Sequence, residues 1–221
     1  MYRIPRIDCN VACPASLEEA FARTVRETVA CNNWPADFPY APQVGFRIFH
    51  TGADLLLRFD VAERCTAART LDDNGPVWTD SCAEFFFRPE GSDSYYNFEC
   101  NCIGTLLVGH RRDRTQAEHA PAEVLRTVRR RATYPHAPLP ETEGDNRWTL
   151  TLAIPAAALF RDRLARWDGV RGAMNLYKCG DDLSCPHYLS WRPVGTPAPD
   201  FHRPEFFEPV FFPTKVHIKS V

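Results

Sequence analysis

The chain has 221 residues, with 26 Lys and Arg against 28 Asp and Glu and a formal net charge of −2. This balance does not favour nucleic acid or an anionic membrane as a partner. No apolar run approaches the roughly 20 residues that a membrane-spanning helix needs. The length suits one domain with a substantial core, and we find neither a linker nor an internal repeat. We therefore expect a single, monomeric domain over residues 1–221.

The N-terminus and the cysteines indicate the compartment. The opening stretch MYRIPRIDCNVACPAS lacks the apolar segment of a signal peptide. The nine cysteines are an odd number, and Cys82, Cys100 and Cys102 fall in predicted strands, where we expect buried, reduced thiols. The interpretation is a cytoplasmic protein if Met1 is the native start, and an extracytoplasmic one otherwise. The cysteine spacing contains no CxxC pair, which disfavours a structural zinc site.

The N-terminal region predicts the only long helix. Residues 1–13 form an extended lead, and Ser16 with Glu19 has the spacing of a capping box. Apolar residues then recur at helical spacing, which predicts a helix from Leu17 to Val29. We expect residues 1–33, lead and helix together, to pack on the rest of the domain.

The remainder of the chain alternates between apolar and polar residues, which predicts strands. The segments VGFRIFHTG and ADLLLRFDVAER form a hairpin around residues 51–54. Further strands are predicted at Ser81–Arg88, Tyr95–Ile103, near Val124–Ala132, and at Trp148–Ile154, Ala173–Cys179 and Phe206–Phe212, with a short helix over Ala156–Leu164. The fold class is all-β: a single antiparallel β-sandwich of immunoglobulin-like or jelly-roll type, with the N-terminal helix and short peripheral helical turns.

Two neighbouring strands carry more polar chemistry than solubility requires. In Tyr95–Ile103, one face is apolar and the other presents Asn97, Glu99 and Asn101. In the preceding strand, Glu84 stands on an otherwise apolar face, where a carboxylate must be hydrogen-bonded or belong to a site. Trp78 lies just upstream, on a predicted loop at the sheet edge. An aromatic plane beside carboxylates and amides suits sugar recognition, because a pyranose stacks on the ring and its hydroxyls pair with the polar groups.

Four blocks of sequence carry a family resemblance, in this order: VWTDSCAEFFFRP with YYNFECNCIGT, NRWTLTLAIPAAALF, GAMNLYKCGDD, and LSWRPVGTPAPDFHRPEFFEPVFF. Together they resemble the family 9 carbohydrate-binding modules and related DOMON-type β-sandwiches over roughly residues 34–212. In those modules a Trp precedes a D-S-x-E-[FIV]-F strand. The residues that match this pattern in spacing are Trp78, Asp80, Ser81, Glu84 and Phe85.

The resemblance implies non-catalytic binding of a mono- or oligosaccharide, often at a glycan chain end, in association with glycan breakdown. Its implied site is concave. The candidate carbohydrate-binding residues are Trp78, Glu84, Asn97, Glu99, Asn101, Asn175, Trp191, Phe201 and His202. Arg111 and Arg112 follow the polar strand and could also reach a sugar hydroxyl.

The second aromatic of the implied site departs from the family pattern. Family 9 modules enclose the sugar between two tryptophans, and the second precedes a P-x-x-F segment. Here Phe201 and His202 occupy that place, and Trp191 lies ten residues before Phe201. Three alternatives follow: Phe201 stacks on the sugar, Trp191 replaces it by another loop path, or sugar binding has been lost.

Rival functions stay open. Asp80, Glu84 and Glu99 could supply the two carboxylates of a glycoside hydrolase, or the domain could be a DOMON-like interaction module without a ligand. Another structural interpretation packs Trp78 under the Asp72–Gly75 loop and pairs Glu84 with Arg111. A haem-binding DOMON domain is disfavoured, because its Met ligands would have to come from Met1 or Met174.

Calcium is the one cofactor that the sequence leaves open. Relatives in the family bind it, and the loop Leu71–Gly75 is rich in hard oxygen ligands. The D-x-[DN]-x-[DN]-G spacing is absent, which favours an ordinary turn.

Overall fold

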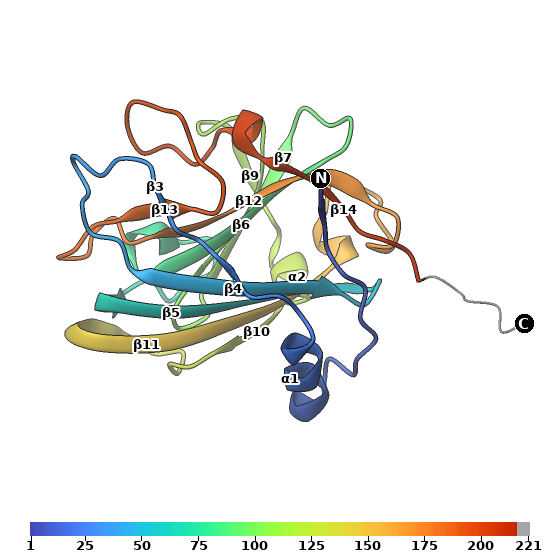
Figure 1. The fold of residues 1–221 in the computed structure, drawn as a ribbon, viewed down its shortest axis with the longest axis horizontal. Coiled ribbons are helices and arrows are strands. Elements are labelled where there is room, and N and C mark those ends of the chain that lie inside the picture. The colour runs from blue at the N-terminus through green and yellow to red at the C-terminus, as the bar shows by residue number, and fades with distance from the viewer. Residues whose placement is uncertain (216–221) are drawn as a thin grey trace, which may run out of the picture.

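Two β-sheets face each other in the computed structural model, which describes residues 1–215 (Figure 1). The strands of the larger sheet are β1 (Tyr2–Arg3), β3 (Cys31–Asn32), β6 (Cys82–Pro89), β7 (Tyr95–Asn101), β8 (Leu106–Arg111), β9 (Ala117–His119), β12 (Arg171–Cys179), β13 (Tyr188–Ser190) and β14 (Glu208–Phe211). Their order is β1-β14-β12-β6-β7-β8-β9, with β13 paired to β12 and β3 to β13. Apart from the parallel pair β1–β14, these strands pair in antiparallel fashion.

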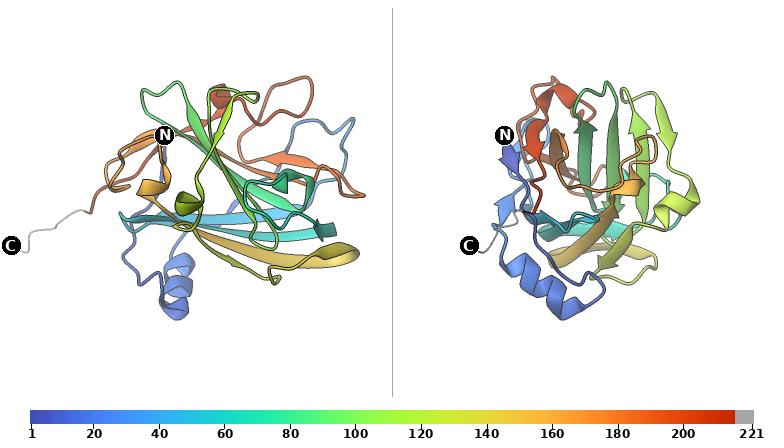
Figure 2. Two further views of the ribbon diagram at one scale, coloured as in Figure 1. Left: turned by 180° about the vertical axis from the view of Figure 1, so that it is seen from behind. Right: turned by 90° about the vertical axis from the view of Figure 1, so that its right-hand side faces the viewer.

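The smaller sheet is antiparallel throughout and has the order β10-β11-β5-β4-β2. Its strands are β2 (Glu27–Thr28), β4 (Gln43–His50), β5 (Asp54–Ala68), β10 (Arg129–Ala132) and β11 (Leu139–Pro155). β4 and β5 form the predicted hairpin, and the two facing sheets confirm the predicted β-sandwich (Figure 2).

The core lies between the sheets because each strand turns its apolar residues inward. Leu57 and Phe59 on β5 meet Phe85 on β6, Phe98 on β7 and Leu176 on β12 within one buried cluster. Strand side chains alternate between the two faces, so the other residues of β6, β7 and β12 point away from this core. Every residue of β7 is nevertheless buried, because loops cover the outer face of the larger sheet.

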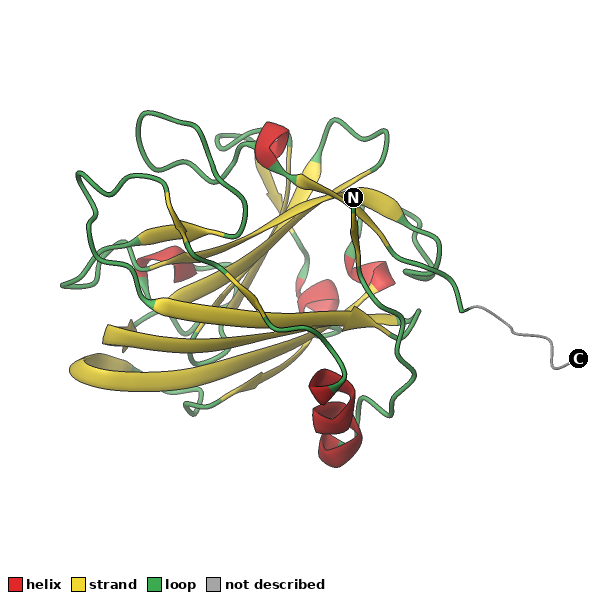
Figure 3. Cartoon of the chain, viewed as in Figure 1, coloured by secondary structure: helices red, strands yellow, loops and turns green. Residues whose placement is uncertain are grey.

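Helical structure is short and peripheral (Figure 3). The N-terminal helix α1 (Pro14–Ala22) packs through Leu17 and Phe21 on the outer face of the smaller sheet. The predicted extension to Val29 is wrong: Val25 is 73% exposed, and the chain turns into β2, which pairs with β4. The capping box is also wrong, because Cys13 is the N-cap and the Ser16 hydroxyl accepts a hydrogen bond from the Asn10 amide.

Other element boundaries differ from the prediction as well. Residues 122–132 divide into a short helix, α2 (Ala122–Leu125), and β10 rather than forming one strand. Only Ala156–Ala158 forms a helical turn in the predicted helix up to Leu164. β11 is longer than expected because it pairs with β5 along almost its whole length. β14 begins at Glu208 because Pro204–Phe206 forms a 3-10 turn. No helix among the described residues is long and apolar enough to cross a membrane.

A buried ion pair bridges the two sheets inside the core. The Lys178 ammonium on β12 lies 2.8 Å from the carboxylate of Glu63 on β5 and also donates to the Cys179 carbonyl. The other carboxylate oxygen of Glu63 accepts a hydrogen bond from the indole of Trp148. Burial and the Lys178 charge lower the pKa of His187 to about 3, and this neutral imidazole lies 2.7 Å from the Lys178 ammonium. Both charges are therefore compensated, as burial requires.

Replacing Lys178 with Met should lower the free energy of unfolding by roughly 3–5 kcal/mol, because the Glu63 carboxylate is then left uncompensated in the core. Urea denaturation at pH 7 measures this difference. A Lys178→Met/Glu63→Gln double variant should recover part of the loss, since Gln removes the charge and keeps an acceptor for Trp148. Equal losses in the single and double variants would contradict this role.

Candidate functional site

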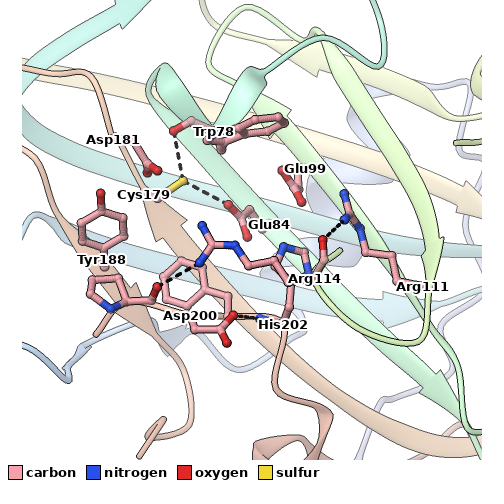
Figure 4. A pocket seen from close by; sticks show the side chains of 12 residues that line it. Trp78, Glu84, Glu99, Arg111, Arg114, Cys179, Asp181, Tyr188, Asp200 and His202 are labelled. Carbon is pink, nitrogen blue, oxygen red and sulfur yellow. Dashed lines mark hydrogen bonds between the residues drawn. The ribbon is translucent and has the colours of Figure 1, made fainter. Parts of the chain in front are cut away.

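A pocket of about 210 Å³ lies on the outer face of the larger sheet (Figure 4). β6, β7 and β12 supply its floor, and loops supply its walls. The lining residues are Trp78, Glu84, Glu99, Arg111, Arg114, Cys179, Asp181, Tyr188, Pro199, Asp200, Phe201 and His202. The pocket therefore combines aromatic rings, carboxylates and guanidinium groups.

Two carboxylates lie side by side on the floor. Glu84 on β6 is directly opposite Glu99 on β7, and both side chains are only 3% exposed. Burial and the neighbouring Glu99 raise the pKa of Glu84 well above its usual value, and burial raises the pKa of Glu99 to about 7. The Cys179 thiol donates to Glu84 over 3.0 Å. Strongly raised carboxyl pKa values in a pocket are typical of functional sites.

A chain of hydrogen bonds fixes one side of the floor. The Arg111 guanidinium donates to the Asn97 side-chain oxygen over 2.9 Å, and the Asn97 amide donates to Glu99 over 2.7 Å. Gly109 makes room for this arrangement: a Cβ there would lie 2.6 Å from the Asn97 oxygen. Asn97 thus orients both Glu99 and Arg111, and neither Arg111 nor Arg114 forms an ion pair with another described residue.

Aromatic side chains form the walls. Trp78 lies in a 3-10 turn (Val77–Thr79) just before β6, and its side chain is 38% exposed. From the segment between β13 and β14, Phe201 stacks on Tyr177 with ring centroids 4.1 Å apart. The adjacent His202 ring lies 2.9 Å from the Tyr95 hydroxyl, and burial lowers its pKa to about 3. The accessible Trp78 ring contradicts the interpretation that it packs under the Asp72–Gly75 loop, and Glu84 pairs with Cys179 rather than Arg111.

The structure brings Trp78, Glu84, Glu99, Phe201 and His202 into the pocket, with Asn97 directly behind them. Three other candidates, Trp191, Asn101 and Asn175, lie outside the pocket, which corrects their assignment to the site. Trp191 packs in the core between the sheets, against Tyr2 and Phe46. Asn101 donates to Asp80 and to the Thr70 carbonyl, so it stabilises a turn.

Asn175 is the third candidate outside the pocket. Its side-chain oxygen accepts hydrogen bonds from the backbone amides of Leu176 and Arg192, and its amide donates to the Arg192 carbonyl. It therefore ties β12 to the start of the segment that carries Phe201. Strand alternation placed it correctly on the outer face but could not show that the chain itself would use its polar atoms.

Two further polar groups serve the fold. The buried Asp80 carboxylate accepts hydrogen bonds from the amides of Arg69 and Thr70. In the loop that was considered for calcium, Asp73 pairs with Arg130 and accepts from the Leu106 amide. The carboxylate oxygens of both residues are thus already engaged by protein donors.

Several pocket residues were missed by sequence reasoning. Arg114, Asp181 and Asp200 lie in loops, where no periodicity predicts the direction of a side chain. Cys179 shares one face of β12 with Tyr177 and Asn175 by strand alternation, but nothing in the pattern assigned it a function. Arg111 was expected near the site and lines the pocket, whereas Arg112 lines a separate hollow beside β9.

A model of carbohydrate-binding family 9 matches residues 13–212, nearly the whole chain. The chain belongs to carbohydrate-binding family 9. A crystal structure from Bacteroides uniformis shows similarity at 39% identity with a TM-score of 0.89, covering 95% of this chain and 97% of that one. That protein carries a provisional assignment as a carbohydrate-binding protein. No curated protein matches the chain.

Two distant family 9 structures share the fold. Both are a family 9 module from Caldicellulosiruptor kristjanssonii, solved in complex with glucose and with cellotriose. Each is 8% identical to this chain. The glucose complex has a TM-score of 0.59 and covers 99% of this chain and 98% of that one, and the cellotriose complex has a TM-score of 0.60 and covers 100% and 97%. The family 9 sandwich is thus retained although almost all side chains differ.

Replacing Glu99 with Gln should stabilise this family 9 domain at alkaline pH. The folded-state pKa of Glu99 lies near 7, above its ordinary value, so the stability that its proton contributes is lost as the pH rises from about 4.5 through 7. At pH 8 the variant should be more stable than the wild type by at least about 1.4 kcal/mol. Denaturation at pH 4.5 and pH 8 measures the change, with the exposed Glu123→Gln as control. A difference that does not vary with pH would contradict the buried, raised carboxyl.

Proposed function

We propose that the pocket binds a small saccharide, or the end of a glycan chain, without cleaving it. The observation that carries this proposal is the partly exposed Trp78 ring beside the paired carboxyl groups of Glu84 and Glu99. An exposed indole offers an apolar plane to the C–H face of a pyranose, and fixed polar groups at its edge give direction to the hydroxyls.

Each polar group has a distinct part in this proposal. Glu84 and Glu99 accept hydrogen bonds from sugar hydroxyls, or donate one when protonated. Arg111 donates from the side of its guanidinium that Asn97 does not engage. Phe201 and His202 cover the sugar from the wall contributed by the segment before β14. Because Asn97 and Tyr95 already fix the orientations of these groups, binding requires little ordering of the pocket.

The arrangement of the carboxylates favours binding over hydrolysis. Glycoside hydrolases place two carboxyl groups on either side of the scissile bond. Glu84 and Glu99 lie on adjacent strands of one sheet face, so both approach a ligand from the same side. Asp80, the third residue considered for catalysis, is engaged by backbone amides. We therefore propose a binding domain that accompanies glycan breakdown by other proteins.

Family membership and the bound relatives support the same function. The chain matches a carbohydrate-binding family over residues 13–212, and a family 9 module of the same fold was solved in two complexes, with glucose and with cellotriose. Glucose and short glucans are thus the first ligands to test on this chain. The nine cysteines are all free, which suits the proposal that the domain works in a reducing compartment.

Replacing Trp78 with Ala should weaken saccharide binding at least about tenfold, because a stacked ring contributes up to about 1.5 kcal/mol beyond the area it buries. Isothermal titration calorimetry with glucose, cellobiose and cellotriose, followed by a wider set of mono- and disaccharides, measures the affinity. The melting temperature should hardly change, since the ring is partly exposed and packs outside the core.

The matched control is Leu71→Ala, which also removes a partly exposed apolar side chain from a loop, but outside the pocket. This variant should bind as the wild type does. Unchanged binding by Trp78→Ala, or its unfolding, would contradict the assignment of Trp78 as the stacking platform. Absence of binding by the wild type to every sugar tested would contradict the proposed function as a whole.

A further inference from the structure

Three potential metal ligands meet on the pocket floor. The thiols of Cys82 and Cys179 and a carboxylate oxygen of Glu84 all lie within 4.8 Å of one another, and all three residues are buried. The Cys179 sulfur is 3.0 Å from the Glu84 oxygen. Glu84 and Cys179 line the pocket, so solvent and ions can reach this cluster from the pocket side.

The strand register brings these residues together. Cys82 on β6 is directly opposite Cys179 on β12, and Glu84 lies two residues further along β6 on the same face. The two cysteines are far apart in the sequence, so a search for closely spaced cysteine pairs cannot detect them. Pairing between distant strands can thus assemble a zinc site from cysteines that are not neighbours along the chain.

We propose that Cys82, Cys179 and Glu84 bind a thiophilic divalent cation, with Zn²⁺ as the best match. Two thiolates and one carboxylate are ligands that zinc accepts, and sites with three protein ligands keep one position open. With Zn–S bonds of about 2.3 Å, two sulfurs on one tetrahedral ion lie roughly 3.8 Å apart. The ligand atoms of the cluster already lie within 4.8 Å of one another, so modest side-chain movements bring them onto one ion.

Cation binding at this cluster needs no reactant other than the ion itself. Each thiol loses its proton to solvent as its sulfur binds the ion, and so does the Glu84 carboxyl group where it is protonated, so that Glu84 binds as the carboxylate. The cation thus compensates the charge of a carboxylate that otherwise lies buried beside Glu99. The open position faces the pocket, where one buried oxygen of Asp181 has no hydrogen-bond partner among the described residues. That oxygen is available to the ion or to its bound water.

The thiols have no strong competing partners. Apart from its two neighbours in the cluster, the Cys82 sulfur makes one long hydrogen bond among the described residues, 3.9 Å, to the Ala83 carbonyl. The Cys179 sulfur contacts the Trp78 carbonyl at 3.5 Å in addition to Glu84. Weak sulfur hydrogen bonds can be exchanged for metal bonds at little loss. The proposed cation and sugar sites share Glu84, but cation binding is measured without sugar, so the failure of one proposal can be told from the failure of the other.

Cobalt substitution tests the site directly. The full chain, purified under reductant and then kept anaerobic, is titrated with Co²⁺ and the intense near-ultraviolet thiolate-to-cobalt absorption is recorded. We expect this absorption to saturate at one equivalent and to be displaced by Zn²⁺, which binds thiolate sites more tightly. Zn²⁺ alone should also raise the melting temperature, since it binds only the folded cluster.

Matched variants locate the ion. Cys82→Ser and Cys179→Ser should each weaken Co²⁺ binding by more than the roughly 10–100-fold typical of outer-shell changes, and Glu84→Gln should shift the spectrum. The control is Cys185→Ser, because Cys185 and Cys65 form a second buried pair of neighbouring thiols away from the pocket. Circular dichroism confirms that each variant is folded. Three results would overturn the proposal. The absorption band is absent, the band is lost only in Cys185→Ser, or Cys82 and Cys179 are recovered as a disulfide from the reduced preparation.

Discussion

The outer face of the larger sheet is buried without a third layer of secondary structure to cover it, and the site depends on this constraint. The strands β6, β7 and β12 need apolar cover on both faces, and the second cover consists of irregular segments that contribute Trp34, Val194, Phe201 and Phe207. Loops cover a sheet incompletely. The gap that they leave is the pocket, and its floor is as rigid as the paired strands beneath it (Figure 4).

Buried charged groups have different surroundings on the two faces of the larger sheet. On the inner face, Lys178 forms an ion pair with Glu63 of the smaller sheet, whose carboxylate also accepts a hydrogen bond from Trp148, so this charge pair is part of the fold. On the outer face, Glu84 and Glu99 lie opposite each other with raised pKa values, and neither forms an ion pair with a residue that the structure describes. This arrangement lowers stability, and such a loss is typical of residues retained for binding. An external partner, whether hydroxyl groups or a cation, would compensate it.

Sequence patterns predicted the sandwich and half of the site because the side chains of a strand alternate between its two faces. Alternation in β6 and β7 fixes which side chains share a face, so Glu84, Asn97 and Glu99 could be placed together without coordinates. Patterns could not show which polar atoms the chain would use itself, and Asn101 and Asn175 were therefore overassigned. Trp191 was assigned to the site incorrectly. Its backbone amide pairs with Leu176 of β12 and its side chain lies in the core between the sheets, which no local sequence pattern reveals.

Nitrogen-edited NMR of the labelled protein during a saccharide titration tests the central claim most directly, because it reports every backbone amide and the Trp78 indole at once. If the pocket is the binding site, adding glucose, cellotriose or another saccharide that binds should shift the Trp78 indole signal, the Arg111 side-chain signal and the amides around Asp181 and Phe201. Signals of α1 and of the smaller sheet should stay in place. Shifts confined to another surface, with the Trp78 indole unmoved at saturation, would contradict the account.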